Sequence, residues 1–244
     1  MKIHINQTVG HLVAKDYRLA SVFKSLGIDF CCQGNKSLKE VCDEGNISFE
    51  IVVQQLELIL LHEKKETVNY QSWSVDQLVN HIEIKHHRYV EKAILGLKPY
   101  LNKVVVVHGD KHPELFEIKK YFNIVAEELS KHMMKEELML FPYISRLAKA
   151  MKTGAYVGKP AFGSVRNPIE MMQREHSDEG NRFNEIAILT NNYNPPQDAC
   201  NTFKVTYALL KEFEEDLHLH IHLENNILFP KAITLEEELN GILQ

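Results

Sequence analysis

The sequence has few cysteines, one tryptophan and no long apolar run. Four cysteines among 244 residues, two of them adjacent at 31 and 32, do not form a disulfide framework, so we expect reduced thiols. A membrane-spanning helix needs about 18 or more consecutive apolar residues, and none is present. The start, MKIHINQTVGHLVAKD, lacks a basic segment followed by an apolar one, so no signal peptide is expected. A cytoplasmic protein is predicted.

The sequence also lacks an excess of positive charge. The net charge of −5 argues against a nucleic-acid backbone as the main partner. Hydrophobic residues at 44% and charged residues at 25% are typical of a globular protein whose core needs no metal or disulfide to form. What is abundant is histidine, with thirteen residues, so the question is whether these cluster.

The first part of the chain, residues 1–65, is predicted to be a small all-helical domain. A helix ends at Gly27, the loop IDFCCQGNK follows, and Ser37 with Glu40 forms a capping-box pattern. A further apolar pattern at helical spacing occupies residues 48–65. Residues 66–76 are polar and are predicted to be a linker. Ser74 near its end, with Gln77 three residues further on, suggests a second capping box.

The rest, residues 77–235, is predicted to be an up-down-up-down four-helix bundle. The expected helices cover about residues 74–98, 113–149, 167–192 and 197–232. Pro99, Pro113, a glycine-rich loop and Pro195-Pro196 mark their boundaries. The segment VVVVHG, 104–109, favours a strand by propensity, but a strand would have no partner, so we interpret it as helix end or loop. The fold class is therefore all-α.

One motif occurs twice: HMMKEELMLFP from His132 and HIHLENNILFP from His220. In each copy a glutamate, Glu136 or Glu224, follows the histidine by four residues, which places imidazole and carboxylate on one helical face. Two copies with the same offset to Phe-Pro, on helices that run in the same direction in a bundle, point to one shared site. The other two helices offer His86 or His87, and His176.

Four histidines and two carboxylates are too many ligands for one tetrahedral zinc ion. Two metal ions bridged by two glutamates, each ion also bound by two histidines, use every ligand and leave positions open for water, oxo or a diatomic molecule. The pattern differs from ferritin-like bundles, because lone histidines stand where those bundles have lone glutamates.

The motifs HMMKEELMLFP, QREHSDEG and HIHLENNILFP resemble those of hemerythrin-like di-iron bundles. Together with GIDFCCQGN near the amino terminus, they resemble the repair-of-iron-centres family, which joins a small Cys-Cys domain to such a bundle. The resemblance implies two iron ions in an oxo- and carboxylate-bridged centre, with Glu136 and Glu224 as the bridges. The implied ligands are His87, His132, Glu136, His176, His220 and Glu224.

The ligand on the first helix of the bundle is open between two residues. The family usually has Tyr-His where this chain has His86-His87, and its register favours His87. His86 nevertheless falls equally well on an apolar stripe. That stripe contains Val79, Ile82, Ala93 and Leu97. The remaining histidines near the motifs, His81, His218 and His222, are expected to be surface, core or hydrogen-bonding residues.

Two interpretations of Cys31 and Cys32 compete. They are either partly buried structural thiols, or thiols of lowered pKa near a helix terminus that take part in redox exchange or iron transfer. Family members commonly have Cys-Cys-Gly-Gly, whereas here Gln33 and Asn35 interrupt the glycines. Cys42 and Cys200 lie within helical patterns and are expected in the core.

The resemblance implies repair of iron-sulfur clusters damaged by nitrosative or oxidative stress, through iron donation or removal of nitric oxide (NO). Damaged iron-sulfur proteins and NO or O₂ are the implied partners, and a homodimer is one possible assembly. An O₂ or NO sensor or store, and an NO-reducing enzyme, are the alternatives, so whether the protein is an enzyme stays open.

Overall fold

The computed structural model describes residues 3–61 and 68–242, and these residues form two compact units. One unit contains residues 79–220. The other contains residues 1–78 together with 221–244. Within the described ranges there is no β-strand, and an isolated bridge joins Thr8 to Ser37. The predicted all-α fold is confirmed.

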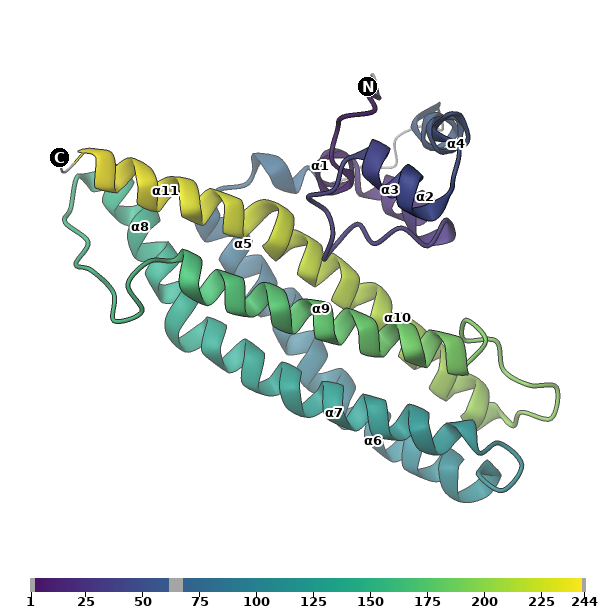
Figure 1. Cartoon of the computed structure of the whole chain (residues 1–244). Helices are drawn as coiled ribbons and strands as arrows, with labels where there is room; N and C mark the ends of the chain where they lie inside the picture. Colours follow the sequence, from purple (N-terminus) through teal and green to yellow (C-terminus); the bar gives the residue numbers. More distant parts are fainter. Residues whose placement is uncertain (1–2, 62–67, 243–244) are drawn as a thin grey trace. The chain divides into compact units, whose positions relative to one another are not determined.

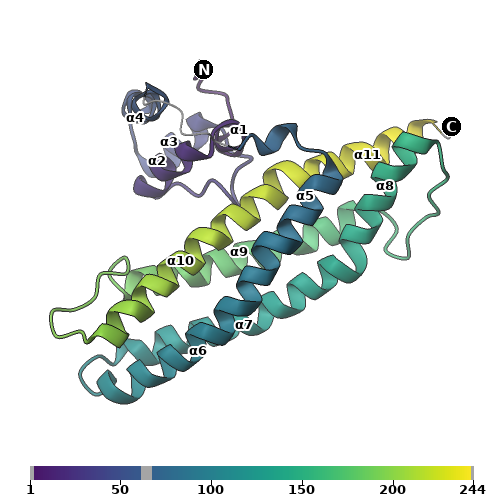
Figure 2. The same ribbon diagram turned by 180° about the vertical axis from the view of Figure 1, so that it is seen from behind.

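The unit of residues 79–220 is a bundle of long helices. These are α6 (Arg88–His108), α7 (Glu114–Lys135) with its continuation α8 (Phe141–Thr153), α9 (Arg166–Leu189) and α10 (Asn201–Leu223), which runs past the end of this unit. Helices α6, α7, α9 and α10 lie side by side in both views (Figures 1 and 2). Helix α7 packs against both α6 and α9.

Aromatic packing holds the four helices together at Phe213 of α10. Its ring lies 5.4 Å from that of Phe122 on α7, 5.4 Å from that of Phe183 on α9, and 6.3 Å from that of Tyr89 on α6. The ring of Phe122 belongs to an apolar stripe repeated every three or four residues on α7, where Leu115, Ile118 and Phe122 are buried. The helical periodicity of the sequence therefore builds the core of the bundle.

The prediction that the first bundle helix ends at Pro99 is wrong, because α6 continues through Pro99 to His108. Proline removes one backbone hydrogen bond and crowds the preceding turn. Here Pro99 is exposed, so water can satisfy the carbonyl that is left without its donor. The buried stripe continues beyond it with Leu101 and Val104, which outweighs the local cost and makes the VVVV segment helical.

The last long helix differs from its expected bounds of 197–232. It begins at Asn201, after Pro195-Pro196, and continues through a π turn (Glu224–Leu228) into α11 (Phe229–Ile242). Two further π turns interrupt the other helices. The turn Ile82–His87 lies between α5 (Val75–His81) and α6, and the turn Glu136–Leu140 lies between α7 and α8.

The other unit contains four short helices near the amino terminus: α1 (Val9–Lys15), α2 (Ala20–Ser25), α3 (Leu38–Gly45) and α4 (Phe49–Leu61). Short 3₁₀ turns occupy Tyr17–Leu19 and Tyr70–Ser72. Gly27 has a φ of 68° after α2, as expected of a helix-ending glycine. Both predicted capping boxes form, with the Ser37 N–H donating to Glu40 at 2.7 Å and the Ser74 N–H to Gln77 at 2.9 Å.

The predicted domain boundaries, 1–65, 66–76 and 77–235, stay a prediction. Residues 62–67, including His62 and the start of the expected linker, lie outside the described residues. The compact units divide the chain differently at the carboxyl end, because residues 221–244 group with the amino-terminal residues. Among the helices that the structure describes, none is long and apolar enough to cross a membrane.

Candidate metal centre

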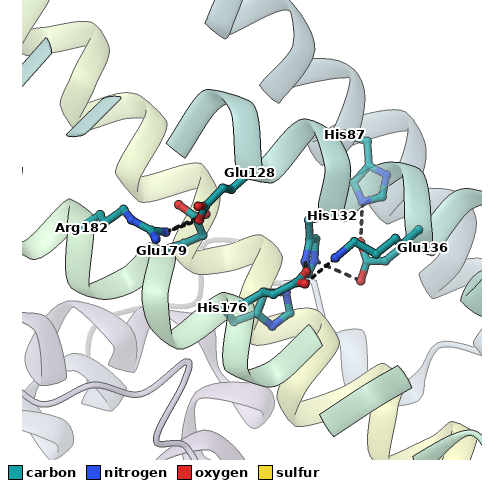
Figure 3. A network of polar contacts seen from close by, with 9 residues as sticks. His87, Glu128, His132, Glu136, His176, Glu179 and Arg182 are labelled. Carbon is teal, nitrogen blue, oxygen red and sulfur yellow. Dashed lines mark hydrogen bonds and ion pairs between the residues drawn. The ribbon is translucent and has the colours of Figure 1, made fainter. Parts of the chain in front are cut away.

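One group of candidate ligands joins α7, the π turn after it and α9. The Nε2 atoms of His132 and His176 lie 3.0 Å apart, and Glu136 Oε1 lies 3.4 Å from His132 Nε2 (Figure 3). All three side chains are buried, and their ligand atoms lie within 4.8 Å of one another. Four residues separate His132 from Glu136, so the helix itself presents both on one face, whereas His176 arrives from a neighbouring helix.

A second group shares Glu136. Its other oxygen, Oε2, lies 3.4 Å from Nε2 of His87, a fully buried residue at the end of the first π turn. His220 of α10 completes this group, with its ring 5.0 Å from that of His87 and a ligand atom within 4.8 Å of the other two. The two oxygens of one carboxylate therefore face two different histidines.

Glu224 lies four residues after His220 on the same continuous run of helix, so both side chains leave that helix on one side. Its side chain is fully buried, with 0% of its surface exposed. Like Glu136, it is the first residue of a π turn. The two copies of the repeated motif thus adopt the same local structure.

The Phe-Pro end of the motif accounts for the two π turns that begin at Glu136 and Glu224. In each copy the phenylalanine N–H bonds to the carbonyl of the glutamate five residues earlier, Phe141 to Glu136 and Phe229 to Glu224. The next residue is proline, which has no N–H and whose ring crowds the preceding turn of a regular α-helix. A widened turn relieves this crowding and changes the direction in which the glutamate points. The sequence therefore carried a signal for these two π turns that the periodicity analysis did not use.

His86 and His87 are both buried, but they face different partners. His86 Nδ1 lies 3.0 Å from Asp216 Oδ1, and its ring stacks on that of His220 at 5.5 Å. His87 faces Glu136 instead. Both residues lie in the π turn, and their rings meet different partners because successive side chains of a helix point in directions about 100° apart.

Two candidate ligands, His87 and His132, each have a carboxylate beside Nδ1, the ring nitrogen that is not turned toward Glu136. The sequence analysis did not single out either carboxylate. His87 Nδ1 lies 2.8 Å from Glu137, and His132 Nδ1 lies 2.8 Å from Glu175. Such contacts select the imidazole tautomer that leaves Nε2 for a metal ion. The sequence could have indicated both carboxylates, because each is adjacent to a candidate ligand. Glu137 directly follows Glu136, and Glu175 directly precedes His176.

The same contacts shift the pKa values of these carboxyls. The hydrogen bond to His132, aided by Lys135, lowers the pKa of Glu175 to about 2. Burial opposes ionisation of Glu137, yet hydrogen bonds with His87 and Arg88 hold its pKa below the usual value. Both groups are therefore anionic at neutral pH and accept a hydrogen bond from the imidazole N–H.

A further buried carboxyl lies one turn from the first ligand group (Figure 3). Arg182 contacts Glu128 at 2.7 Å and Glu179 at 3.1 Å. Glu179 is 2% exposed, and burial raises its pKa to about 8. One arginine thus balances one carboxylate, and the second carboxyl keeps its proton at neutral pH.

The thiols of Cys31 and Cys32 lie together in the loop after Gly27, with the sulfur atoms 3.9 Å apart. Of the two interpretations of the pair, the one with a lowered pKa is wrong for Cys31. The contact with Cys32, burial and the nearby Asp29 carboxylate all raise the pKa of its thiol. Cys42 is buried as expected, whereas Cys200 is exposed and precedes α10, with its sulfur 3.2 Å from His108 Nε2.

Two models of known domains match the chain. The Hemerythrin HHE cation binding domain matches residues 78–232, and the ScdA_N domain, described as Domain of Unknown function (DUF542), matches residues 5–59. Proteins named "Iron-sulfur cluster repair protein YtfE" from Escherichia coli O8 (strain IAI1) and from Shigella boydii serotype 4 (strain Sb227) are each 34% identical over 231 residues. The match covers 95% of this chain and 98% of theirs.

This chain belongs to the repair-of-iron-centres family. The histidine and glutamate groups lie within the part that matches the hemerythrin domain, a cation-binding domain by its description. The Cys-Cys loop lies within the part that matches the ScdA_N domain. The family membership expected from the motifs is confirmed.

Proposed function

We propose that the chain binds two iron ions, with Glu136 as a carboxylate that bridges them. The observation that carries the proposal is that the two oxygens of Glu136 each lie 3.4 Å from a different imidazole, Oε1 from His132 and Oε2 from His87. A carboxylate that served a single ion would direct its oxygens toward one set of ligands. His176 joins His132 on one side, and His220 joins His87 on the other.

The spacing of the nitrogens fits metal ligation. Two nitrogens bound to one ion at about 2.1 Å and at a right angle are about 3.0 Å apart. The Nε2 atoms of His132 and His176 are separated by 3.0 Å. Imidazole and carboxylate donors suit iron, and the ligand set of Glu136, Glu224 and four histidines exceeds what one zinc ion takes. Glu224, which repeats the local structure of Glu136, is the second proposed bridge.

His87 is the proposed ligand of the first bundle helix, rather than His86. Support comes from the direction of each ring, since His87 Nε2 faces Glu136 while its Nδ1 contacts Glu137. His86 Nδ1 contacts Asp216, and its ring stacks on His220. We propose that His86 supports the ring of His220.

A pair of iron ions with nitrogen and oxygen ligands supplies redox change and an open position for NO or O₂. The chain's own residues orient the ligands and keep the site dry. Glu137 and Glu175, both anionic, accept hydrogen bonds from Nδ1–H of His87 and of His132. Each Nε2 is therefore held unprotonated and can bind a metal ion. Burial of His87, Glu136 and Glu224 at 0% exposure excludes bulk water.

The function that these features support best is repair of iron-sulfur clusters damaged by nitrosative or oxidative stress, in the cytoplasm. Relatives that match over nearly their whole length carry the name of iron-sulfur cluster repair proteins. Damaged iron-sulfur proteins are the proposed partners, and donation of iron or removal of NO is the proposed contribution. The oxo bridge between the irons belongs to this proposal as well.

Metal analysis of anaerobically purified protein tests the site. About two iron atoms per chain are expected in the wild type, and both Glu136→Ala and Glu224→Ala should lose them because an ion that loses its bridge also loses a ligand. Glu185→Ala, an exposed change on α9, is the matched control and should keep its iron. Zinc at full occupancy, or iron content unaffected by the two bridge variants, would contradict the proposal.

The repair role needs a separate assay. The iron-loaded protein is added to an enzyme whose iron-sulfur cluster NO has damaged, and recovery of that enzyme's activity is measured. Recovery with wild type and none with Glu136→Ala supports repair. Reversible binding of NO or O₂ without recovery would instead indicate a sensor or store, and continued NO consumption with an electron donor would indicate an NO-reducing enzyme.

A further inference from the structure

The loop between α2 and α3 brings a carboxylate and two thiols together, apart from the histidines and glutamates of the bundle. Cys31 Sγ lies 3.3 Å from Asp29 Oδ1 and 3.9 Å from Cys32 Sγ. One ligand atom from each of the three residues lies within 4.8 Å of the other two. All four cysteines of the chain are thiols in this structure, so no disulfide occupies the pair.

These separations match those around a tetrahedral metal ion. Metal–sulfur bonds of about 2.3 Å at a tetrahedral angle place two sulfurs about 3.8 Å apart, and a sulfur and an oxygen about 3.5 Å apart. The observed 3.9 Å between the sulfurs is close to the first value, and the 3.3 Å from Cys31 Sγ to Asp29 Oδ1 places the carboxylate beside the same space. A disulfide, by contrast, requires sulfurs about 2.05 Å apart.

The three ligands are held in place by hydrogen bonds within the same unit. Asp29 Oδ1 accepts the backbone N–H of Cys31 at 3.0 Å and of Cys32 at 2.9 Å. The carbonyl of Cys31 accepts the side-chain amides of Asn225 and Asn226, each at 3.2 Å. Both N–H bonds fall on Oδ1, so the second oxygen of the carboxylate, Oδ2, keeps its lone pairs for a cation.

Two glycines make this anchoring possible. A Cβ atom at Gly34 would lie 2.2 Å from Asn226 Oδ1, and one at Gly10 would lie 2.3 Å from the same atom. The backbone N–H of Gly10 also donates to the carbonyl of Gly34 at 2.8 Å. The family commonly has a different arrangement of glycines at this point of the loop. In this chain neither Gln33 nor Asn35 has a positive φ, so neither position requires glycine. The loop therefore keeps its glycine where Asn226 approaches.

The ligand types suit a metal ion. A metal ion binds the two cysteines as thiolates, because it takes the place of the thiol protons, which pass to solvent as the ion binds. Two thiolates and one carboxylate then surround a divalent charge.

We propose that Asp29, Cys31 and Cys32 bind one thiophilic divalent cation of the borderline class, Zn²⁺ or Fe²⁺, at a mononuclear site separate from the proposed di-iron centre. Three protein ligands leave the fourth tetrahedral position for water or for a donor from another molecule. Asp29 and Cys32 are half-buried, so the ion is accessible on one side. Such a site exchanges its ion more readily than a closed structural site with four protein ligands.

Cobalt(II) is the probe, since thiolate ligation of this ion produces a charge-transfer absorption that histidine and carboxylate ligation do not. The full chain is first loaded with iron and then titrated with cobalt(II) under reducing, anaerobic conditions, and metal content is measured in parallel. We expect about one cobalt per chain with the thiolate absorption, and zinc should displace it.

Variants identify the ligands. Cys31→Ser and Cys32→Ser should abolish the thiolate absorption, and Asp29→Asn should weaken cobalt binding by about 10-fold or more. Cys200→Ser is the matched control, because this thiol is exposed and lies outside the loop, and it should bind cobalt as the wild type does. Iron content and circular dichroism of each variant establish that the fold is kept.

The proposal fails if the thiolate absorption is absent from the wild type, or if it survives in both Cys31→Ser and Cys32→Ser. It also fails if the reduced pair forms a disulfide in preference to binding cobalt, which a mass lower by two hydrogens would reveal. Glu136→Ala, which should lose iron, is expected to keep the thiolate absorption, so failure of the di-iron proposal and failure of this one are distinguishable.

Discussion

Replacing Glu179 with glutamine should change how the stability of the protein depends on pH. The carboxyl is 2% exposed, and burial raises its pKa to about 8, against a usual value of 4.5. The folded chain therefore holds a proton that the unfolded chain releases between these two values, so the wild type loses stability as the pH rises through this window. Glutamine has nearly the same shape and cannot ionise, so the variant avoids that loss.

The size of the effect follows from the same two values. A difference between 4.5 and about 8, at about 1.4 kcal/mol for each pH unit, corresponds to about 5 kcal/mol over the whole window. Between about pH 5 and about pH 9 the free energy of unfolding of the wild type should fall by about 4 kcal/mol through this group. This is an upper value, because the fold relaxes around a buried charge. Near pH 5 the two proteins should be almost equally stable.

Urea unfolding of metal-free wild type and Glu179→Gln at both pH values measures this difference, and removing the metal prevents ion release from adding its own pH dependence. Glu185→Gln, an exposed change on the same helix, is the control, and its free energy of unfolding should equal that of the wild type at both pH values. If the free-energy difference between Glu179→Gln and wild type is the same at both pH values, Glu179 is ionised in the folded protein and the reasoning is refuted.

Two further predictions concern the supports of the two proposed sites. Glu137→Ala removes the acceptor 2.8 Å from His87 Nδ1, so a chelator should remove iron about 10–100-fold faster than from the wild type. An unchanged release rate would mean that Glu137 does not hold the ring. Gly34→Ala places a methyl group 2.2 Å from Asn226 Oδ1 and 2.7 Å from the Phe30 carbonyl oxygen. Thermal unfolding should therefore show a loss of about 1–3 kcal/mol in the free energy of unfolding. Gly96→Ala is the control, because its methyl group would have no atom within 4 Å, and it should not show this loss.

Much of the candidate centre could be predicted from residues close together in the sequence. His132 with Glu136, and His220 with Glu224, share a face because a helix returns to the same direction after nearly four residues, whatever surrounds it. The repetition of the whole motif with the same offset to Phe-Pro was enough to place both copies in one structural context. The capping boxes at Ser37 and Ser74 are local in the same sense, since their hydrogen bonds join residues three apart.

Other features depended on neighbours far along the chain. Pro99 was expected to end a helix, but the buried stripe on both sides of it keeps α6 helical to His108. Cys200 was expected in the core, although it lies exposed beside His108, 92 residues away. Local sequence patterns do not report which side of a helix other helices will cover.

By itself, the sequence determined the all-α fold, the family, and the pairs of histidine and glutamate that share a helical face, because each depends on spacing along one segment. The tertiary structure decided which of His86 and His87 faces Glu136, and which carboxylates orient the imidazoles. These choices depend on π turns that rotate side chains away from the regular helical period, and on atoms that meet across helices 40 to 50 residues apart in sequence. It likewise placed Asp29 beside two adjacent thiols at separations that suit a metal ion.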